Sequence, residues 1–345
     1  MRTMTIGIAL TIGIPTYNGE AYLSECLEGI RNQINSNNIN QIEVLISDNA
    51  SVDQTASIVE KFSDNNPLKT SYYKNESNYG FDRNLDLLFK RASGNFIWLL
   101  GDDDVLRDGA IDYALGLISR HPDLKVIQVN FDKYDSTLKN VIERVEIEDD
   151  HYCRNAQEFH LNSRGRWGAI ASLIIKRDAW NSLDISAALN SNVVFGYGLF
   201  QLLLQGDSFI SKESLVKVRD GSEKAVKIGD GDSRIAIALA SGKLYNSMKQ
   251  MGYEKSLVNW YLLQDRKYAY QSIPIAKFWG IQRKRLAIAN LIQTHNSLIL
   301  WLKWIPYILI PDPIFIRWYR AKKKVSAIFR PYEKMAKAFF RKNNP

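Results

Sequence analysis

Apolar runs and amphipathic stretches alternate along the first 131 residues. Residues 10–14 form an apolar run that predicts a buried strand, and residues 20–33 carry apolar side chains at the spacing of a helix. Further strands are predicted at residues 42–47, 70–74, 95–100 and 125–131, and further helices at residues 53–62, 82–91 and 110–119. Repeated strand–helix–strand units of this length predict a parallel sheet with helices on both faces.

After residue 131 the pattern is less regular. Residues 132–165 are polar, which indicates an irregular excursion or a β-hairpin. A strand, a helix and a late strand are expected at residues 168–175, 177–189 and 209–218, and from about residue 233 the pattern becomes helical. Glycines at 221, 229 and 231 indicate a boundary near residue 225. We therefore expect an α/β domain over residues 1–225 and a helical region over residues 226–345.

The composition is that of a globular protein. Hydrophobic residues make up 46% and charged residues 24% of the 345 positions, which excludes a mainly disordered, collagenous or fibrous chain. Cys26 and Cys153 are far apart, and the four histidines have no paired spacing. Neither a disulfide framework nor a histidine-rich zinc site is therefore expected, and a reducing compartment is the simplest interpretation.

The positive charge is concentrated at the C-terminal end. Residues 283–345 contain fourteen Lys and Arg and two acidic residues, a formal net charge of +12, whereas the whole chain carries +8. Such a tail indicates an acidic partner, which is either an anionic membrane surface or nucleic acid.

Aromatic residues are interleaved with the basic ones in this tail, from Trp301 to Phe340. The mixture suits the interface of an anionic bilayer, and the apolar run at residues 305–316 has no role on a phosphate-binding face, so nucleic acid is disfavoured. An ordinary helical packing element with a basic outer face is the remaining alternative. Since the chain has no secretory signal and no apolar run of about 18 residues, we expect a cytoplasmic protein, peripheral on the inner face of the plasma membrane.

Polar, turn-forming clusters follow four of the predicted strands. They occupy residues 15–20, 48–55, 78–84 and 101–104. Carboxyl ends of parallel strands meet at one edge of a sheet, where ligands of such folds bind, so these clusters should converge on one cleft. Each cluster also has a purely structural interpretation, such as helix capping by Asp53 or a surface ion pair of Arg83.

The cluster Asp102-Asp103-Asp104 is the most informative of the four. Three adjacent carboxylates at the end of an apolar strand repel one another unless a cation or hydrogen-bond donors offset their charge. Oxygen ligands at this density suit Mg²⁺ or Mn²⁺ shared with substrate phosphates. We therefore expect a divalent metal that bridges to a diphosphate, and a solvated acidic loop is the alternative.

Four segments resemble the motifs of family 2 glycosyltransferases of the GT-A fold. They are Ile14-Pro15-Thr16-Tyr17-Asn18, residues 46–55, Asn78-Tyr79-Gly80 with Arg83-Asn84, and residues 100–106, in the family's order and spacing over residues 10–110. Residues 171–180 resemble the second half of bacterial O-antigen glycosyltransferases of the abequosyltransferase type. The resemblance implies an α/β, Rossmann-like, mainly parallel sheet with a nucleotide-sugar-binding half (1–110) and an acceptor half (111–225).

The resemblance also implies roles for individual residues. Asp48 would accept a hydrogen bond from the nucleotide base, and a uracil or thymine N3–H or a cytosine amino group would suit it equally, so the base stays open. Thr16 and Tyr17 would line the base and the ribose, with Glu20 capping that pocket. Arg83 would reach the base or the diphosphate. The expected nucleotide-sugar-binding residues are Pro15, Thr16, Tyr17, Glu20, Asp48, Asn49, Asn78, Arg83 and Asp102.

The family's metal motif reads Asp-x-Asp-Asp, and this chain has Gly101 in place of the first aspartate. The resemblance implies that Asp103 is the main metal ligand, with Asp102 beside it. Asp103 and Asp104 are the expected catalytic carboxylates, and Asp102 and Asp104 are also candidates for contacts with ribose or water. Mg²⁺ or Mn²⁺ is the expected cofactor.

The general base has no assignment from the sequence. Inverting members carry an acidic residue at the start of a late helix, but residues 193–200 contain neither a carboxylate nor a histidine. Arg219 and Asp220 end the late strand, and a location near the donor diphosphate and one on the surface are both open.

Together these features predict a glycosyltransferase for a hexose or deoxyhexose. It would transfer the sugar, with a metal, from a nucleotide-sugar donor to a lipid-linked (polyprenyl diphosphate) glycan acceptor in bacterial cell-surface polysaccharide biosynthesis of the O-antigen type. A sugar-nucleotide pyrophosphorylase is one alternative, but it would carry a Gly-rich phosphate loop near the N-terminus that this sequence lacks. The other alternative is a non-catalytic membrane- or nucleic-acid-binding protein on the same fold.

Overall fold

The computed structural model describes residues 7–144, 146–163, 165–220, 231–278, 281, 284–295 and 298–318. The chain forms two compact units. Unit 1 comprises Met1–Lys227 and Gln250–Gly252, and unit 2 comprises Ile228–Lys249 and Tyr253–Pro345. The boundary expected near residue 225 and the end of the basic tail, residues 319–345, lie outside the described residues.

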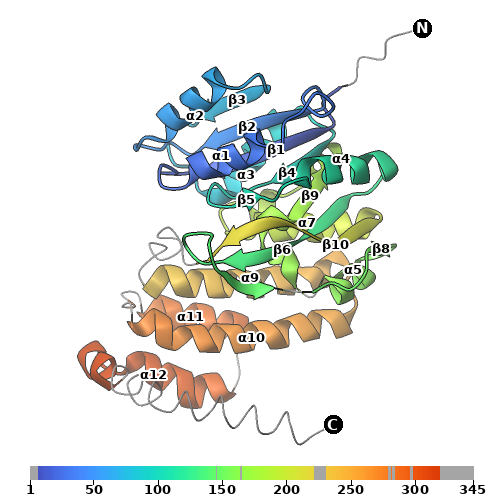
Figure 1. The fold of residues 1–345 in the computed structure, drawn as a ribbon. Coiled ribbons are helices and arrows are strands. Elements are labelled where there is room, and N and C mark those ends of the chain that lie inside the picture. The colour runs from blue at the N-terminus through green and yellow to red at the C-terminus, as the bar shows by residue number, and fades with distance from the viewer. Residues whose placement is uncertain are drawn as a thin grey trace, which may run out of the picture. The chain divides into compact units, whose positions relative to one another are not determined.

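The N-terminal half of unit 1 is a parallel sheet (Figure 1). Strand β1 (Leu10–Thr16) lies between β2 (Ile42–Asp48) and β4 (Phe96–Leu99), and β3 (Thr70–Lys74) pairs with the other side of β2. All three pairings are parallel, with Leu10 opposite both Ile42 and Phe96. The predicted parallel arrangement of these four strands is confirmed.

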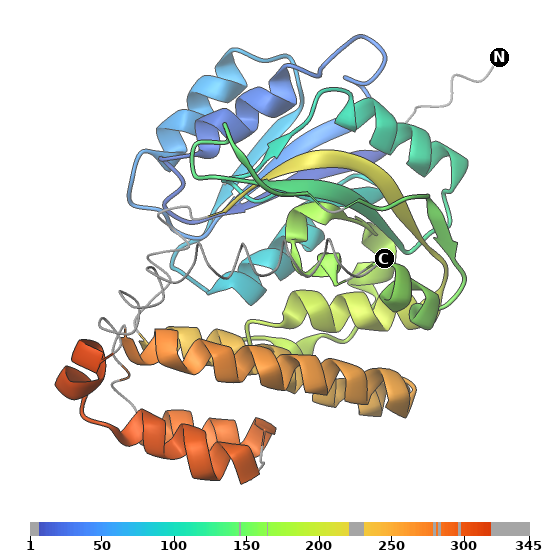
Figure 2. The ribbon, with the colours of Figure 1, turned by 60° about the horizontal axis from the view of Figure 1, so that its bottom comes forward.

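Helices pack on both faces of this parallel sheet, as predicted. They are α1 (Leu23–Arg31), α2 (Thr55–Asp64), α3 (Phe81–Arg91) and α4 (Ala110–Arg120). The apolar residues of α1, α2 and α4 share one core with Leu10, Ile12 and Ile14 of β1, whereas α3 covers the opposite face (Figure 2). Helix α3 approaches β1 so closely that a Cβ atom at Gly13 would lie 2.6 Å from a methyl group of Leu88, so a larger residue there would have to displace Leu88.

The C-terminal half of the sheet is mixed. Strand β9 (Leu173–Lys176) pairs antiparallel with β4 and with β6 (Val126–Tyr134), and β10 (Ser208–Arg219) runs parallel to β6. Three short antiparallel strands complete it, namely β5 (Val105–Leu106), β7 (Val141–Arg144) and β8 (His151–Cys153). The β6–β7 pair is the hairpin, one of the two expectations for residues 132–165.

The strand expected at residues 168–175 is shorter than predicted. Two 3₁₀ turns, η1 (Arg166–Gly168) and η2 (Ile170–Ser172), precede β9, which begins only at Leu173. The Ser172 hydroxyl donates a 2.7 Å hydrogen bond to the carbonyl of Ala169, and this local bond closes the turn in place of a strand pairing.

The helix expected at residues 177–189 is also too long. Helix α6 (Arg177–Asn181) ends where the Ser182 hydroxyl donates to the carbonyl of Ala179 at 2.7 Å, and a 3₁₀ turn, η3 (Ser186–Ala188), follows. Helix α7 (Val194–Gln205) comes next, and α5 (Ala156–Asn162) precedes η1. Trp180 of α6 stacks on Phe89 of α3, with ring centroids 4.2 Å apart.

Unit 2 is helical, as the pattern after residue 233 predicts. It contains most of α9 (Gly231–Met251), with α10 (Lys255–Phe278), α11 (Lys284–His295), a π-helical turn η4 (Leu300–Trp304) and α12 (Ile305–Leu309). Its apolar core includes Tyr270 of α10, Leu291 of α11 and Ile308 of α12. Within the described ranges, no helix is both long enough and apolar enough to cross a membrane.

Candidate active site

The polar clusters converge at the carboxyl edge of the parallel strands, as expected. Thr16 at the end of β1 is paired with Asp48 at the end of β2, and Asp48 is paired with Lys74 at the end of β3. The Thr16 hydroxyl also donates to Oδ2 of Asp102 at 2.5 Å, which joins the end of β1 to the turn that follows β4. One edge therefore carries the predicted residues of the first, second and fourth strands.

The loops after β1 and β2 are bonded to each other. The Asn18 amide donates to the Ser51 hydroxyl at 2.8 Å, and the Glu20 amide donates to Oδ2 of Asp53 at 3.0 Å. The Glu20 carboxylate in turn accepts the amide of Gln54 at 3.1 Å, at the N-terminus of α2. Glu20 thus caps a helix in this structure, and its expected contact with the nucleotide pocket stays a prediction.

Asp48 is fully buried, and both of its carboxylate oxygens accept hydrogen bonds. Oδ1 accepts from the amide of Ser51 at 2.8 Å and from its hydroxyl at 2.5 Å, and Oδ2 accepts from the Tyr72 hydroxyl at 2.5 Å. Burial and this carboxylate together raise the pKa of Tyr72, so its hydroxyl keeps its proton. Asp48 therefore organises the turn after β2, and acceptance of a base at this carboxylate remains a prediction.

Asn49 and Asn78 connect the loops after β2 and β3. The Asn49 amide donates to the Thr16 carbonyl at 2.9 Å, and its side-chain Nδ2 donates to Oδ1 of Asn78 at 2.7 Å. Oδ1 of Asn49 accepts the amide of Tyr79 at 2.9 Å. Both predicted residues thus hold the edge together, and the aromatic rings of Tyr17 and Tyr79 are exposed beside them.

A second polar network lies behind this edge, and the sequence reasoning missed most of it. Nδ2 of Asn84 donates to the Ser47 carbonyl at 2.8 Å, while Nδ2 of Asn75 donates to Oδ1 of Asn84 at 2.9 Å. Arg91 donates to Oδ1 of Asn75 at 3.3 Å. Asn75 and Arg91 belong to no recognisable motif, and only their places at the ends of β3 and α3 could have indicated them.

The three aspartates after β4 lie in unequal environments. Asp102 and Asp104 are buried, each 7% exposed, whereas Asp103 is half-buried. Burial, with the charges of Asp103 and Asp102, raises the pKa of Asp104 to about 7, although the backbone amide of Arg219 opposes this effect. Burial and the same three carboxylates raise the pKa of the Cys26 thiol, which donates to the Gly101 carbonyl. Because Asp102 and Asp104 are buried and Asp103 is only half-buried, Asp103 is the aspartate best exposed to a ligand.

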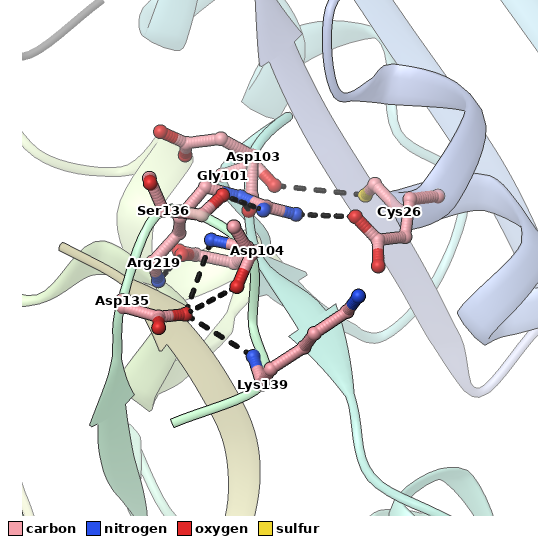
Figure 3. A network of polar contacts seen from close by, with 10 residues as sticks. Cys26, Gly101, Asp103, Asp104, Asp135, Ser136, Lys139 and Arg219 are labelled. Atoms are coloured by element: carbon pink, nitrogen blue, oxygen red, sulfur yellow. Dashed lines mark hydrogen bonds and ion pairs between the residues drawn. The ribbon is translucent and has the colours of Figure 1, made fainter. Parts of the chain in front are cut away.

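Arg219 lies against the turn formed by Asp102, Asp103 and Asp104, here called the acidic turn (Figure 3). Because Arg219 is buried, the surface location that the sequence left open is excluded. Its backbone amide donates to Oδ1 of Asp104 at 3.0 Å, and its Nε donates to the Asp103 carbonyl at 2.9 Å. A buried guanidinium next to three carboxylates offsets part of their mutual repulsion.

Arg83 and its neighbour Asp82 reach the loop before α7. Nε of Arg83 donates to Oδ1 of Asn190 at 3.0 Å, which is a different contact from the expected one with base or diphosphate. The buried Asp82 carboxylate accepts the amides of Asn192 at 2.7 Å and Val194 at 3.3 Å, and burial raises its pKa. Asp82 thus caps α7 from α3, and no sequence signal distinguished it from a surface aspartate.

The acidic turn fits a metal that is shared with a substrate. In the part of the chain that the structure describes, no group of three or more His, Cys, Asp or Glu side chains could hold a metal ion by itself. Asp102 and Asp103 supply hard oxygen donors, and Mg²⁺ sites of this kind use one or two carboxylates together with substrate phosphates. The donor set therefore suits a metal that binds together with a diphosphate.

Two curated proteins illustrate the relatives of this chain. Abequosyltransferase RfbV of Salmonella typhimurium is 26% identical over 295 residues, which cover 79% of this chain and 85% of that protein. The GalNAc(5)-diNAcBac-PP-undecaprenol β-1,3-glucosyltransferase of Campylobacter jejuni is 32% identical over 106 residues, which cover 30% of this chain and 32% of that protein. Both relatives are named as enzymes that transfer sugars.

Solved structures agree with the fold. The structure of residues 1–349 of TarS from S. aureus in complex with UDP-GlcNAc superposes with a TM-score of 0.56 at 16% identity, over 87% of this chain and 79% of that one. The glycosyl transferase family 2 model matches residues 11–183, which is half of the chain and contains every predicted site residue. The resemblance, the fold class and the assignment as a glycosyltransferase enzyme are confirmed, and the chain belongs to glycosyl transferase family 2.

Proposed function

We propose that this chain transfers a sugar from a nucleotide-sugar donor to a lipid-linked glycan on a polyprenyl diphosphate, in the synthesis of a bacterial cell-surface polysaccharide of the O-antigen type. The hydrogen bond from Thr16 to Asp102 carries the proposal. It joins the loop expected to receive the nucleoside to the acidic turn expected to receive the diphosphate. Both ends of a nucleotide-sugar would thus be held at one edge of the sheet.

The donor would lie across the loops after β1, β2 and β4. The exposed rings of Tyr17 and Tyr79 offer apolar faces to a base or ribose. Asp48 and Asn49 hold these loops in place, and Pro15 at the end of β1 restricts the backbone there. Arg83 is exposed enough to leave Asn190 for a phosphate.

Asp103 and Asp102 would hold Mg²⁺ or Mn²⁺ together with the diphosphate. Such a metal neutralises the charge that develops on a nucleoside diphosphate as it leaves. Asp104, whose pKa is near 7, would contribute to the site through the turn that it shares with Asp103. The general base keeps no assignment, and Asp82 is not a candidate for it because its carboxylate already accepts the amides of Asn192 and Val194 at the start of α7.

The acceptor and the location are inferred from the relatives and from unit 2. The name of the Campylobacter enzyme specifies a glycan on undecaprenol diphosphate, and RfbV is an abequosyltransferase. Residues 298–318 of unit 2 expose several large apolar side chains, namely Leu298, Ile299, Trp301, Leu302, Leu309, Ile314 and Trp318. Together with the basic tail, they support binding to an anionic membrane surface on the cytoplasmic side.

Release of nucleoside diphosphate from a panel of UDP-, CDP-, GDP- and TDP-sugars tests the proposal. The protein would be assayed with Mn²⁺ or with EDTA, and with or without a polyprenyl-diphosphate glycan. We expect one donor to be consumed with Mn²⁺, faster when the acceptor is present. No consumption of any donor under either condition would contradict a transferase role.

Asp103→Ala should lower this turnover by about 100-fold, because the half-buried ligand of the metal is lost. The melting temperature should be almost unchanged, since one of three repelling charges is removed. Asp108→Ala, at an exposed aspartate five residues later, is the matched control and should keep full turnover. Equal turnover of the Asp103→Ala variant and the parent would exclude Asp103 as a ligand.

A further inference from the structure

We infer that Arg219 is a positioning residue that holds the acidic turn so that Asp103 can bind a metal together with a nucleoside diphosphate. The inference rests on the proposed function and assigns a role to a residue outside the motifs of the donor half. Arg219 ends β10, more than a hundred residues after the turn that it contacts. Only the tertiary structure brings the two together.

The first set of contacts fixes the turn itself. The backbone amide of Arg219 donates to Oδ1 of Asp104 at 3.0 Å, and its Nε donates to the carbonyl of Asp103 at 2.9 Å. Neither of these two bonds involves the Asp103 carboxylate. Arg219 therefore restrains the turn on the C-terminal side of the Asp103 Cα atom, through the carbonyl of Asp103 and the side chain of Asp104.

The second set of contacts fixes Arg219. Its Nη2 donates to Oε2 of Glu25 at 2.5 Å, its Nη1 donates to the carbonyl of Ser136 at 2.5 Å, and its guanidinium lies 4.5 Å from the centroid of the Tyr22 ring. Tyr22 and Glu25 stand at the start of α1, and Ser136 lies in the turn between β6 and β7. Arg219 thus ties the acidic turn to both halves of unit 1 (Figure 3).

Thr16 and Arg219 hold the same turn at different residues. Thr16 binds the Asp102 carboxylate, and Arg219 binds the carbonyl of Asp103 and the carboxylate of Asp104. The half-buried Asp103 side chain lies between these two restraints. A turn held in this way presents its ligand with little loss of conformational entropy when a metal binds.

An arginine is required because three acceptors lie in three directions around the side chain. The planar guanidinium directs Nε, Nη1 and Nη2 to Asp103, Ser136 and Glu25 at once. A lysine ammonium at the end of a flexible chain could keep the charge but not this fork. The side chain is only 2% exposed, so water cannot replace the lost bonds.

Arg219→Lys is the test, with Arg166→Lys as its matched control. Arg166 is equally buried and has contacts of the same kinds, because it donates to the carbonyl of Phe131 and to the carboxylate of Glu143 and lies over the Phe131 ring. Among the described residues, no hydrogen bond or ion pair joins Arg166 to the acidic turn. Binding of UDP, CDP, GDP and TDP would be measured by calorimetry with Mn²⁺ and with EDTA, beside the melting temperature.

We expect Arg219→Lys to weaken Mn²⁺-supported binding about tenfold, as the loss of a charged hydrogen bond predicts, and to change binding in EDTA by less than about twofold. Arg166→Lys should change neither affinity. Glu25→Gln serves as the test if Arg219→Lys does not fold, because the Glu25 side chain is half-exposed. It removes the charge that pairs with Arg219 and should weaken Mn²⁺-supported binding about threefold.

Three outcomes would overturn the inference. One is parental Mn²⁺-supported affinity in Arg219→Lys or, if that variant does not fold, in Glu25→Gln. The second is an equal loss with Mn²⁺ and with EDTA, which would make Arg219 a purely structural residue. The third is a parent whose affinity is the same in Mn²⁺ and EDTA. A parent that binds none of the four nucleotides would instead contradict the proposed function itself.

Discussion

At the scale of single residues, Asp48 and Asp103 stand at the same edge of the sheet in opposite environments. Asp48 is fully buried and accepts three hydrogen bonds, whereas Asp103 is half-buried in a turn held by Thr16 and Arg219. Both are aspartates at or just after strand ends, so the sequence alone assigns them similar exposure. Their surroundings make Asp48 a residue on which the turn depends and Asp103 one that can meet a ligand.

Asp48→Ala should therefore lower stability as well as donor affinity. The change leaves the buried donors of Ser51 and Tyr72 without their acceptor, which predicts a loss of about 1–3 kcal/mol in the free energy of unfolding. Tyr72→Phe removes only one of these bonds and should cost less. Urea denaturation of both variants checks the order, and an Asp48→Ala variant as stable as the parent would mean that these bonds contribute nothing.

At the scale of elements, the loops and helices of unit 1 are fixed by contacts between distant segments. Asp82 of α3 caps α7, and Glu20 caps α2 from the loop after β1. Helix α5 is held in a similar way, because His160 packs edge-on against Phe200 of α7, with ring centroids 4.9 Å apart. These contacts join elements whose order along the chain does not reveal their proximity.

The burial of His160 predicts a pH dependence of stability. Desolvation lowers its pKa to about 3, below its usual value, so the folded state favours the neutral ring. The resulting stabilisation is complete above the unfolded pKa of about 6.5 and is lost as the pH falls toward 3. We expect the parent to lose about 2.5 kcal/mol more between pH 7 and pH 4.5 than His160→Gln does.

Urea denaturation at the two pH values would measure this difference. His121→Gln is the control, since it also removes an imidazole but at a half-buried position. Equal pH dependence of the parent and His160→Gln would show that the ring is protonated as easily in the folded state as in the unfolded chain.

At the scale of the whole molecule, the apolar surface and the charge of unit 2 lie in the same part of the chain. The one acidic residue of residues 298–318, Asp312, accepts hydrogen bonds from Lys277 at 3.1 Å and Lys284 at 3.0 Å. Lys277 is fully buried and also donates to the carbonyl of Ile308 at 2.7 Å. These bonds hold the segment with the exposed tryptophans against α10 and neutralise its only negative charge.

The protein should therefore sediment with anionic liposomes and not with neutral ones. Added salt should release part of it, because charges on a surface are screened over about 8 Å at physiological ionic strength. The double variant Trp301→Ala/Trp318→Ala should reduce the fraction that resists salt, since it removes two exposed aromatic side chains. Equal sedimentation of the parent with anionic and with neutral liposomes, or sedimentation with neither, would contradict an anionic membrane surface as the partner.

The sequence by itself determined the parallel strands, their helices and the convergence of the clusters after β1, β2 and β4. Hydrophobic periodicity is local, and the carboxyl ends of parallel strands meet for topological reasons, so no distant contact is needed to infer either. The motifs also sufficed for the family, because their order and spacing lie within residues 11–183.

Only the tertiary structure decided which of these polar residues face a ligand and which hold the fold. Asp48 bonds to the turn after β2, Glu20 caps α2 from the loop after β1, Arg83 reaches Asn190, and Arg219 is buried against the acidic turn. The lengths of α6 and β9 also depended on serine hydroxyls that bind nearby carbonyls in place of a regular element. Burial and hydrogen bonding depend on segments that are distant in sequence, and a local pattern contains no information about them.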